Sequence, residues 1–185
     1  MSSHHIVRED QEPALLISDA HAVPFEILQQ LLEWSPTVLV IEKALQEVIT
    51  WGIKIDVVIA PVGNIPKFTE SLQDQFPLKL ISCQGEDDAI ATALYFLIAA
   101  KQKSVNIASS ERLDNFEPFA KLDLSVIQGD KRWSFIRSGL YQKWLPAGRT
   151  LLFYPSNGQP EIVLERDQMI SIKRANGFWI GERNS

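Results

Sequence analysis

The feature that most constrains this chain is a change of hydrophobic period near residue 120. Before that point, short apolar runs alternate with segments that have the period of a helix. After it, apolar and polar residues alternate with a period of two, between turns rich in Gly, Asn, Pro and Asp. The first pattern is typical of a parallel α/β sheet, and the second is typical of antiparallel strands.

The first pattern predicts an α/β domain over residues 14–120. We expect its buried strands at Ala14–Ser18, Thr37–Ile41, Asp56–Ala60, Leu78–Ser82 and Val105–Ala108. We expect its helices at Pro24–Trp34, Ala44–Thr50, Pro66–Phe76 and Asp87–Lys101. The last of these helices is apolar nearly all round, which predicts that it is buried between the sheet and a second layer.

The second pattern predicts a small all-β sandwich over residues 121–185, after a flexible tail at residues 1–13. Its expected strands are Leu122–Gln128, Arg132–Ser138, Thr150–Tyr154, Glu161–Arg166, Met169–Lys173 and Phe178–Ile180. Three tryptophans lie in this part, at Trp133, Trp144 and Trp179. Because aromatic residues fill most small β cores, we expect all three in the core, with an aromatic ligand wall as the alternative.

The glycines and histidines exclude several kinds of site. The 9 glycines of the 185 residues include no adjacent pair and no G-x-G, so the chain has no Rossmann fingerprint. It has no G-K-[ST], and therefore no Walker A loop. Histidine occurs only at His4, His5 and His21, which excludes a His-based triad and an H-x-x-x-H metal site. Acid–base or metal chemistry must therefore use carboxylates.

The cysteine content and the hydropathy point to the cytoplasm. Cys83 is the only cysteine, which excludes an intramolecular disulfide and fits a reducing compartment. Its apolar surroundings predict a buried structural thiol. The longest apolar stretch, Ala89–Ala100, is too short to span a bilayer, and the first residues lack the apolar core of a signal peptide. We therefore expect no membrane partner.

The charges are divided between the two parts of the chain. Residues 1–120 carry 8 Lys/Arg and 17 Asp/Glu, a net charge of −9, and residues 121–185 carry 10 and 6, a net charge of +4. This division indicates two units or faces that attract each other. The basic residues are scattered and the isoelectric point is about 5.2, which argues against a nucleic-acid partner.

Carboxylates follow several of the expected parallel strands, where such sheets bind ligands. Mg²⁺ takes one or two carboxylates and bridges phosphate oxygens, so this pattern favours a magnesium and polyphosphate site. Two of the residues also precede an expected helix, where capping is the alternative role. The carboxylates are Asp19, Glu42, Asp87, Asp88 and Asp114.

Three of these strand ends resemble motifs of the thiamin pyrophosphokinase family. The segment V-L-V-I-E-K-A at 38–44 resembles a strand ending in D-G-G, with Glu42 at the Asp. E-D-D-A-I-A-T-A-L at 86–94 resembles T-D-x-x-x-A-L, and S-E-R-L-D-N at 110–115 resembles G-G-R-x-D-H. The resemblance runs from about Ala14 to Ile180.

The family transfers a diphosphate from ATP to the thiamin hydroxyl with Mg²⁺, in a homodimer with sites between subunits. The resemblance thus implies an α/β catalytic domain followed by a β-sandwich that binds thiamin, with ATP and Mg²⁺ as cofactors. It implies Asp88 and Asp114 as catalytic candidates, and Arg112, Asp87 and Asp88 as phosphate-binding residues. It implies a metal set of Asp87, Asp88, Asp114 and Glu42. A salt bridge to Asp114 or Glu111 is the alternative role of Arg112.

One family motif is replaced. The loop G-D-x-D-S, which supplies the family's main metal ligands, is here Ala60-Pro61-Val62-Gly63-Asn64, without a carboxylate. Phosphoryl-type transfer depends on metal and positioning, so we expect impaired or lost catalysis with retained binding of a nucleotide, a thiamin-like molecule or a partner. Two alternatives stay open. One is an active diphosphokinase that uses rearranged carboxylates on thiamin or a related hydroxymethyl heterocycle. The other is a non-catalytic structural or regulatory interaction module.

Overall fold

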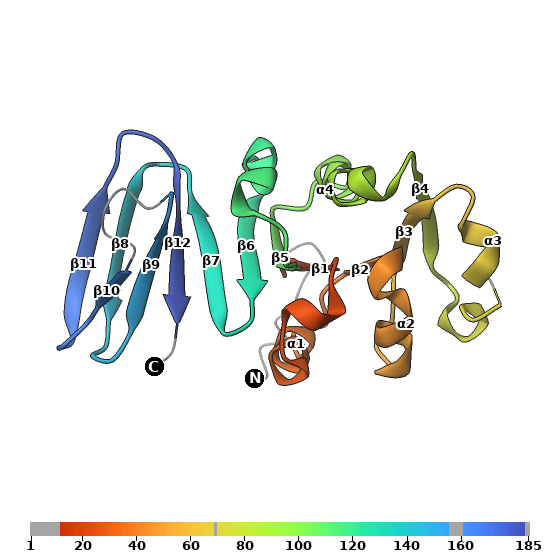
Figure 1. Ribbon diagram of the computed structural model, residues 1–185, viewed down its shortest axis with the longest axis horizontal. Coiled ribbons are helices and arrows are strands. Elements are labelled where there is room, and N and C mark those ends of the chain that lie inside the picture. Colours follow the sequence, from red (N-terminus) through yellow and green to blue (C-terminus); the bar gives the residue numbers. More distant parts are fainter. Residues whose placement is uncertain (1–11, 69, 156–160, 184–185) are drawn as a thin grey trace, which may run out of the picture.

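The computed structural model describes residues 12–68, 70–155 and 161–183. Ten strands form one continuous sheet, in the order β10-β9-β12-β7-β6-β5-β1-β2-β3-β4 (Figure 1). Most of the tail expected at residues 1–13 lies outside the described residues.

The sheet is parallel from β4 to β6 and antiparallel beyond β6. The parallel strands are β1 (Ala14–Ile17), β2 (Val38–Ile41), β3 (Val57–Pro61), β4 (Lys79–Cys83), β5 (Ser104–Ala108) and β6 (Asp123–Gln128). β1 to β5 match the expected strands to within one residue at each end. β6, which we expected in the all-β part, instead pairs with β5 and extends the parallel sheet. The domain boundary at 120/121 stays a prediction.

Helices cover both faces of the parallel strands, which is why these strands are apolar on both sides. On one face, α1 (Phe25–Leu32) and α2 (Glu42–Thr50) pack Leu28, Leu45 and Val48 against β1 and β2. On the other face, α4 (Ala89–Ala99) packs Leu94 and Leu97 against the same strands (Figure 1). The predicted helices at Pro24–Trp34 and Ala44–Thr50 are therefore confirmed.

The helix expected at Pro66–Phe76 is wrong. Only α3 (Ile65–Phe68) and a 3₁₀ turn, η2 (Gln73–Gln75), form there. The side chain of Gln75 instead accepts the N–H of Ile55 at 3.0 Å and donates to the carbonyl of Ile53 at 3.3 Å. These tertiary hydrogen bonds hold the chain that enters β3, and they override a weak helical pattern.

The helix expected at Asp87–Lys101 is shorter and more exposed than predicted. A 3₁₀ turn, η3 (Glu86–Asp88), precedes α4, so neither aspartate lies within the α-helix. One side of α4 is covered by the sheet, but Tyr95 on the other side is 63% exposed. The expectation that this helix is buried all round is therefore wrong.

The C-terminal strands form the predicted sandwich. β7 (Lys131–Ile136), β12 (Phe178–Arg183), β9 (Thr150–Tyr154) and β10 (Glu161–Val163) complete the large sheet. β8 (Leu140–Leu145) and β11 (Gln168–Lys173) pair with each other and pack Tyr141 and Leu145 against it. The sequence did not predict β8, because its exposed Leu140 and Trp144 break the alternation. The fold class is confirmed.

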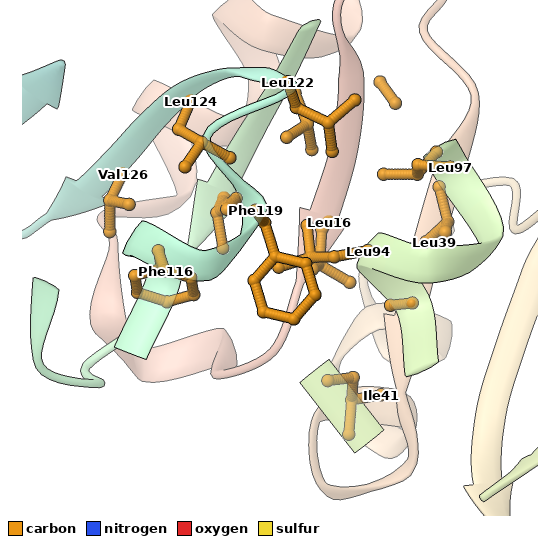
Figure 2. Close-up of a cluster of buried hydrophobic side chains, with 14 of the residues drawn as sticks. Leu16, Leu39, Ile41, Leu94, Leu97, Phe116, Phe119, Leu122, Leu124 and Val126 are labelled. Carbon is orange, nitrogen blue, oxygen red and sulfur yellow. The ribbon is translucent and has the colours of Figure 1, made fainter. Parts of the chain in front are cut away.

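The segment between β5 and β6 closes the core over the sheet. This segment is a 3₁₀ helix, η4 (Leu113–Phe119). Figure 2 shows its Phe116 and Phe119 in one cluster with Leu94 of α4 and Leu16 of β1. Trp179 of β12 lies edge-on to Phe116, with ring centroids 6.5 Å apart, so the same cluster joins the two halves of the sheet.

The three C-terminal tryptophans differ in burial. Trp179 is fully buried, and Trp133 is half-buried against the same core. Trp144 is 61% exposed, so the expectation that it lies in the core is wrong.

Cys83 is buried as predicted, and burial raises the pKa of its thiol. No helix within the described residues is long and apolar enough to cross a membrane.

Candidate functional site

A cavity of about 610 Å³ lies beside the carboxyl ends of β2 and β3. Its apolar lining includes Ile41, Ile90 and Phe119. This is the edge at which parallel sheets bind ligands. Five charged side chains also line the cavity, and they come from the starts of α2 and η3 and from the loop after β5. They are Glu42, Lys43, Glu86, Asp87 and Glu111.

The cavity is acidic, because these side chains bring four carboxylates and one ammonium group. Several of the charges are already engaged within the chain. The Nζ of Lys43 lies 3.7 Å from a carboxylate oxygen of Glu111. Glu111 also accepts a hydrogen bond from Asn115 at 3.2 Å. The only cation of the lining is thus partly neutralised, which disfavours an unaccompanied polyphosphate.

Glu42 is held by the loop that replaces the family's metal-binding motif. Asn64 of this loop donates from Nδ2 to Oε2 of Glu42 at 3.0 Å, and its Oδ1 accepts from Lys67 at 2.6 Å. Pro61 at the end of β3 accepts the N–H of Asn64, which closes the turn. An amide therefore faces Glu42 in a loop that has no carboxylate.

Arg112 and Asp114 form an ion pair outside the lining of this cavity. The guanidinium donates from Nε and Nη2 to the two carboxylate oxygens of Asp114, at 3.1 and 2.8 Å. This bond lowers the pKa of Asp114, and hydrogen bonds with Asp114 and Tyr154 raise the pKa of Arg112. Of the two salt bridges considered for Arg112, the one with Asp114 forms, whereas Glu111 lies beside Lys43.

Asp87 and Asp88 face different cavities. Asp87 lines the 610 Å³ cavity, whereas Asp88 lines a neighbouring one of about 620 Å³ with Val62, Cys83 and Tyr95. Asp88 precedes α4 but makes no side-chain hydrogen bond to cap it. Within the described part of the chain, no three His, Cys, Asp or Glu side chains form a group that fits a metal ion. The catalytic and metal-binding roles of these residues stay predictions.

Asp19 joins the ends of β1 and β5. Its carboxylate accepts the hydroxyl of Ser110 at 2.5 Å and the N–H of His21 at 2.9 Å. The Ser110 hydroxyl is the main reason why the pKa of Asp19 is lowered. The sequence alone did not predict this bond or the Lys43–Glu111 pair. The one sign of them in the sequence is that Lys43, Ser110 and Glu111 stand where the family pattern has glycines, so these positions carry side chains that can form bonds.

Another cavity, of about 1210 Å³, lies by the amino ends of β2 to β4, at the opposite ends of these strands. Asp56 lines this cavity. Its carboxylate accepts the N–H of Val38 at 2.8 Å. Asp56 therefore joins the starts of β2 and β3 and lies far from the carboxyl-end cavity.

Comparison with known proteins adds the fold alone. No protein-family model matches the sequence, and no curated protein matches it. The structure is similar to a thiamine pyrophosphokinase from Bacillus subtilis, with a TM-score of 0.62, 12% identity and coverage of 94% of this chain and 99% of that one. It is also similar to a thiamin pyrophosphokinase from Geobacillus thermodenitrificans, with a TM-score of 0.61, 13% identity and coverage of 93% of this chain and 97% of that one. For a thiamin pyrophosphokinase from Candida albicans, the TM-score is 0.60, the identity 7% and the coverage 96% of this chain and 90% of that one. The resemblance expected from the sequence is thus confirmed for the fold.

Proposed function

We propose that this chain is a thiamin pyrophosphokinase-like protein that binds a small molecule and has lost most or all diphosphate transfer. The observation that carries this proposal is the loop from Ala60 to Asn64. This loop has no carboxylate, and the side-chain amide of its Asn64 donates a hydrogen bond to the Glu42 carboxylate. Transfer of a diphosphate from ATP to thiamin needs a metal and fixed donors to offset the phosphate charge.

The remaining carboxylates support the loss of metal-dependent chemistry. Mg²⁺ requires near-octahedral oxygen ligands that converge on one point. Glu42 is hydrogen-bonded to Asn64, Asp114 is paired with Arg112, and Asp87 and Asp88 line separate cavities. This donor set does not fit the family's metal–nucleotide arrangement.

The acidic cavity supports retained binding of a thiamin-like ligand over a nucleotide. Its four carboxylates favour an organic cation such as the thiazolium of thiamin, and they repel a triphosphate that lacks its metal. Ile41, Ile90 and Phe119 provide an apolar wall for a heterocycle. A cation of this kind is the ligand class that the lining suits best.

The charge division supports a homodimer, and the lone thiol supports a cytoplasmic location. Residues 1–120 are acidic and residues 121–185 are basic, so two copies attract each other when the parts face across an interface. Tyr95 and Val62 are 63% and 66% exposed beside the candidate site, and an interface would cover them. An unpaired Cys83 fits a reducing compartment.

An activity assay tests the loss of catalysis. Purified protein is incubated with ATP, Mg²⁺ and thiamin, and the thiamin diphosphate formed is measured beside the Bacillus subtilis enzyme as a positive control. We expect no product above the protein-free background. Product at a rate comparable to the control would establish the alternative, an active enzyme with rearranged carboxylates.

Thermal melting tests the retained binding. At about a hundredfold excess over the Kd, thiamin should raise the Tm by about 5–10 °C, whereas ATP without metal should not. Glu42→Gln should reduce the rise in Tm caused by thiamin. The control Glu33→Gln, directly after the last residue of α1, should leave this rise unchanged. If neither thiamin nor ATP raises the Tm, the interaction-module alternative is favoured.

A further inference from the structure

A separate polar cavity, of about 290 Å³, lies near the amino ends of β5 and β6. Each of three neighbouring strands, β5, β6 and β7, contributes two polar residues to its lining. In the register of the sheet, Ser104 lies beside Asp123, Asn106 beside Ser125, and Ser125 beside Ser134. The lining residues of this polar stripe are Ser104, Asn106, Asp123, Ser125, Arg132 and Ser134.

The stripe lies where the covering of the sheet changes. Asn106 and Ser125 point to the same face as Ala108 and Ile127, two residues further along, which pack in the core under α1 and α2. Beyond β7, the β8–β11 sheet covers this face. β5, β6 and β7 lie between these two coverings (Figure 1). The cavity thus lies on this face of β5, β6 and β7, away from the cavity at the carboxyl ends of β2 and β3.

Two of the polar side chains are buried. Asn106 is 7% exposed and Ser125 is 9% exposed. Burying such groups is costly unless they are hydrogen-bonded, and Arg132 supplies the bonds. Its Nε donates to the hydroxyl of Ser125 at 2.9 Å, and its Nη2 donates to Oδ1 of Asn106 at 3.1 Å. The guanidinium is therefore positioned by neutral acceptors on two rigid strands.

Arg132 makes no ion pair within the described part of the chain, because both neighbouring acids are engaged elsewhere. Asp123 is paired with Arg137. Glu182, which lies beside Arg132 in the register, accepts the hydroxyl of Tyr141 at 3.0 Å and the ammonium of Lys143 at 2.8 and 2.9 Å. Arg132 is itself exposed, and its guanidinium keeps a positive charge that no carboxylate of the described residues approaches within 4 Å.

We propose that this cavity binds the carboxylate of a small organic acid. The guanidinium of Arg132 offers paired N–H donors to a planar carboxylate, and it is already oriented by Ser125 and Asn106. Ser104 and Ser134 also line the cavity, so their hydroxyls can bind the polar groups of the same ligand. One positive charge matches a monocarboxylate, whereas a phosphate dianion would leave a negative charge uncompensated. The volume lies at the lower limit of ligand cavities, which restricts the ligand to a small molecule.

The test is an NMR titration of the full ¹⁵N-labelled chain at constant ionic strength. The probes are sodium glycolate and inorganic phosphate. Glycolate should cause saturable shifts of the side-chain amide of Asn106 and of the backbone amides of Ser104 and Ser125. Phosphate should cause no saturable shift at these positions. Saturation by phosphate without glycolate, or no saturation by either probe, would overturn the proposal.

Variants separate binding from a structural role of Arg132. Arg132→Gln keeps two donors but removes the charge, and it should weaken glycolate binding by about tenfold or more. Arg132→Lys keeps the positive charge but removes the paired N–H donors of the guanidinium, so it should weaken glycolate binding less. It replaces Arg132→Gln as the test variant if Arg132→Gln does not fold. The control Arg166→Gln, at an exposed position after β10, should bind as the wild type does. Unchanged glycolate affinity in both Arg132 variants would show that Arg132 serves only Asn106 and Ser125, and the proposal would fail.

Discussion

The parallel and antiparallel halves of the sheet are covered in different ways. In the parallel half, helices lie on both faces of β1 and β2, whose residues are all buried. The core there is mostly aliphatic. In the antiparallel half, the β8–β11 sheet covers one face, and aromatic residues such as Tyr141, Phe153 and Phe178 form much of the core. One half is thus a three-layer structure and the other a two-layer structure.

This difference shows where ligands have access. A strand buried on both faces offers only its ends, so the parallel half has its acidic cavity at the carboxyl ends of β2 and β3. At β5 to β7, where the helix layer stops and the second sheet has not begun, one face is free for polar side chains. The covering of each strand therefore determines whether a cavity forms at its end or on its face.

The largest expected effect concerns the link between the halves. Trp179 comes from the antiparallel half but packs against Phe116 in the core beside α4. Trp179→Ala should lower the free energy of unfolding by about 3–5 kcal/mol, because it leaves a large cavity in this core. Urea unfolding measures the change.

The matched control for this prediction is Trp144→Ala, on the exposed side of β8. Trp144 is 61% exposed, so its removal should change the free energy of unfolding by no more than about 0.5 kcal/mol. Equal losses in the two variants would contradict the placement of Trp179 as the residue that joins the halves.

Most of the fold could be predicted from the sequence, because the parallel half has strong local patterns. The runs at Ala14–Ser18 and Thr37–Ile41 are apolar and end at charged residues, which is enough to place buried strands. The failures occur where tertiary contacts override local patterns. Gln75 bonds the backbone at Ile53 and Ile55 where the sequence predicts a helix, and β8 exposes Trp144.

The candidate site could be predicted only in part. Strand ends place Glu42 and Asp87 in one cavity, as the topology requires. The side-chain pairs could not be predicted, because they depend on distances that the sequence does not contain. Examples are the hydrogen bond from Asn64 to Glu42 and the placement of Asp87 and Asp88 in different cavities. The polar stripe was not predicted, because its residues come from three strands and lie together only in the register of β5, β6 and β7.

The second prediction tests the packing on the antiparallel half. A Cβ added at Gly181 would lie 2.9 Å from the ring of Trp133, which crosses β12 at this point. Gly181→Ala should therefore cost about 1–3 kcal/mol of the free energy of unfolding. Gly63, after β3 in the parallel half, has open space around an added Cβ, so Gly63→Ala is the control with a change near zero. A neutral Gly181→Ala, measured in the same urea titrations, would show that the Trp133 ring moves freely.

The smallest expected effect concerns the strand ends of the parallel half. The hydroxyl of Ser110 lowers the pKa of Asp19 below its usual value of 3.8, so their bond stabilises the folded state above that pH and is lost as the pH falls through the lowered pKa. Ser110→Ala should reduce the free energy of unfolding at pH 7 by up to about 1 kcal/mol, since the pair is partly exposed. The difference from the wild type should shrink below about pH 4, as carboxylates become protonated.

The control for this pH dependence is Ser82→Ala, at an exposed position on the edge strand β4. Its difference from the wild type should stay constant across the same pH range, because the exposed hydroxyl of Ser82 makes no hydrogen bond to a carboxylate of the described residues. Urea unfolding from pH 7 to pH 3 measures both variants. A Ser110→Ala difference that is equally constant would mean that the hydroxyl does not act through the Asp19 carboxylate. The ends of β1 and β5 would then be joined by other bonds, such as those from the N–H and the hydroxyl of Ser18 to the carbonyl of Ala108, at 3.0 and 3.1 Å.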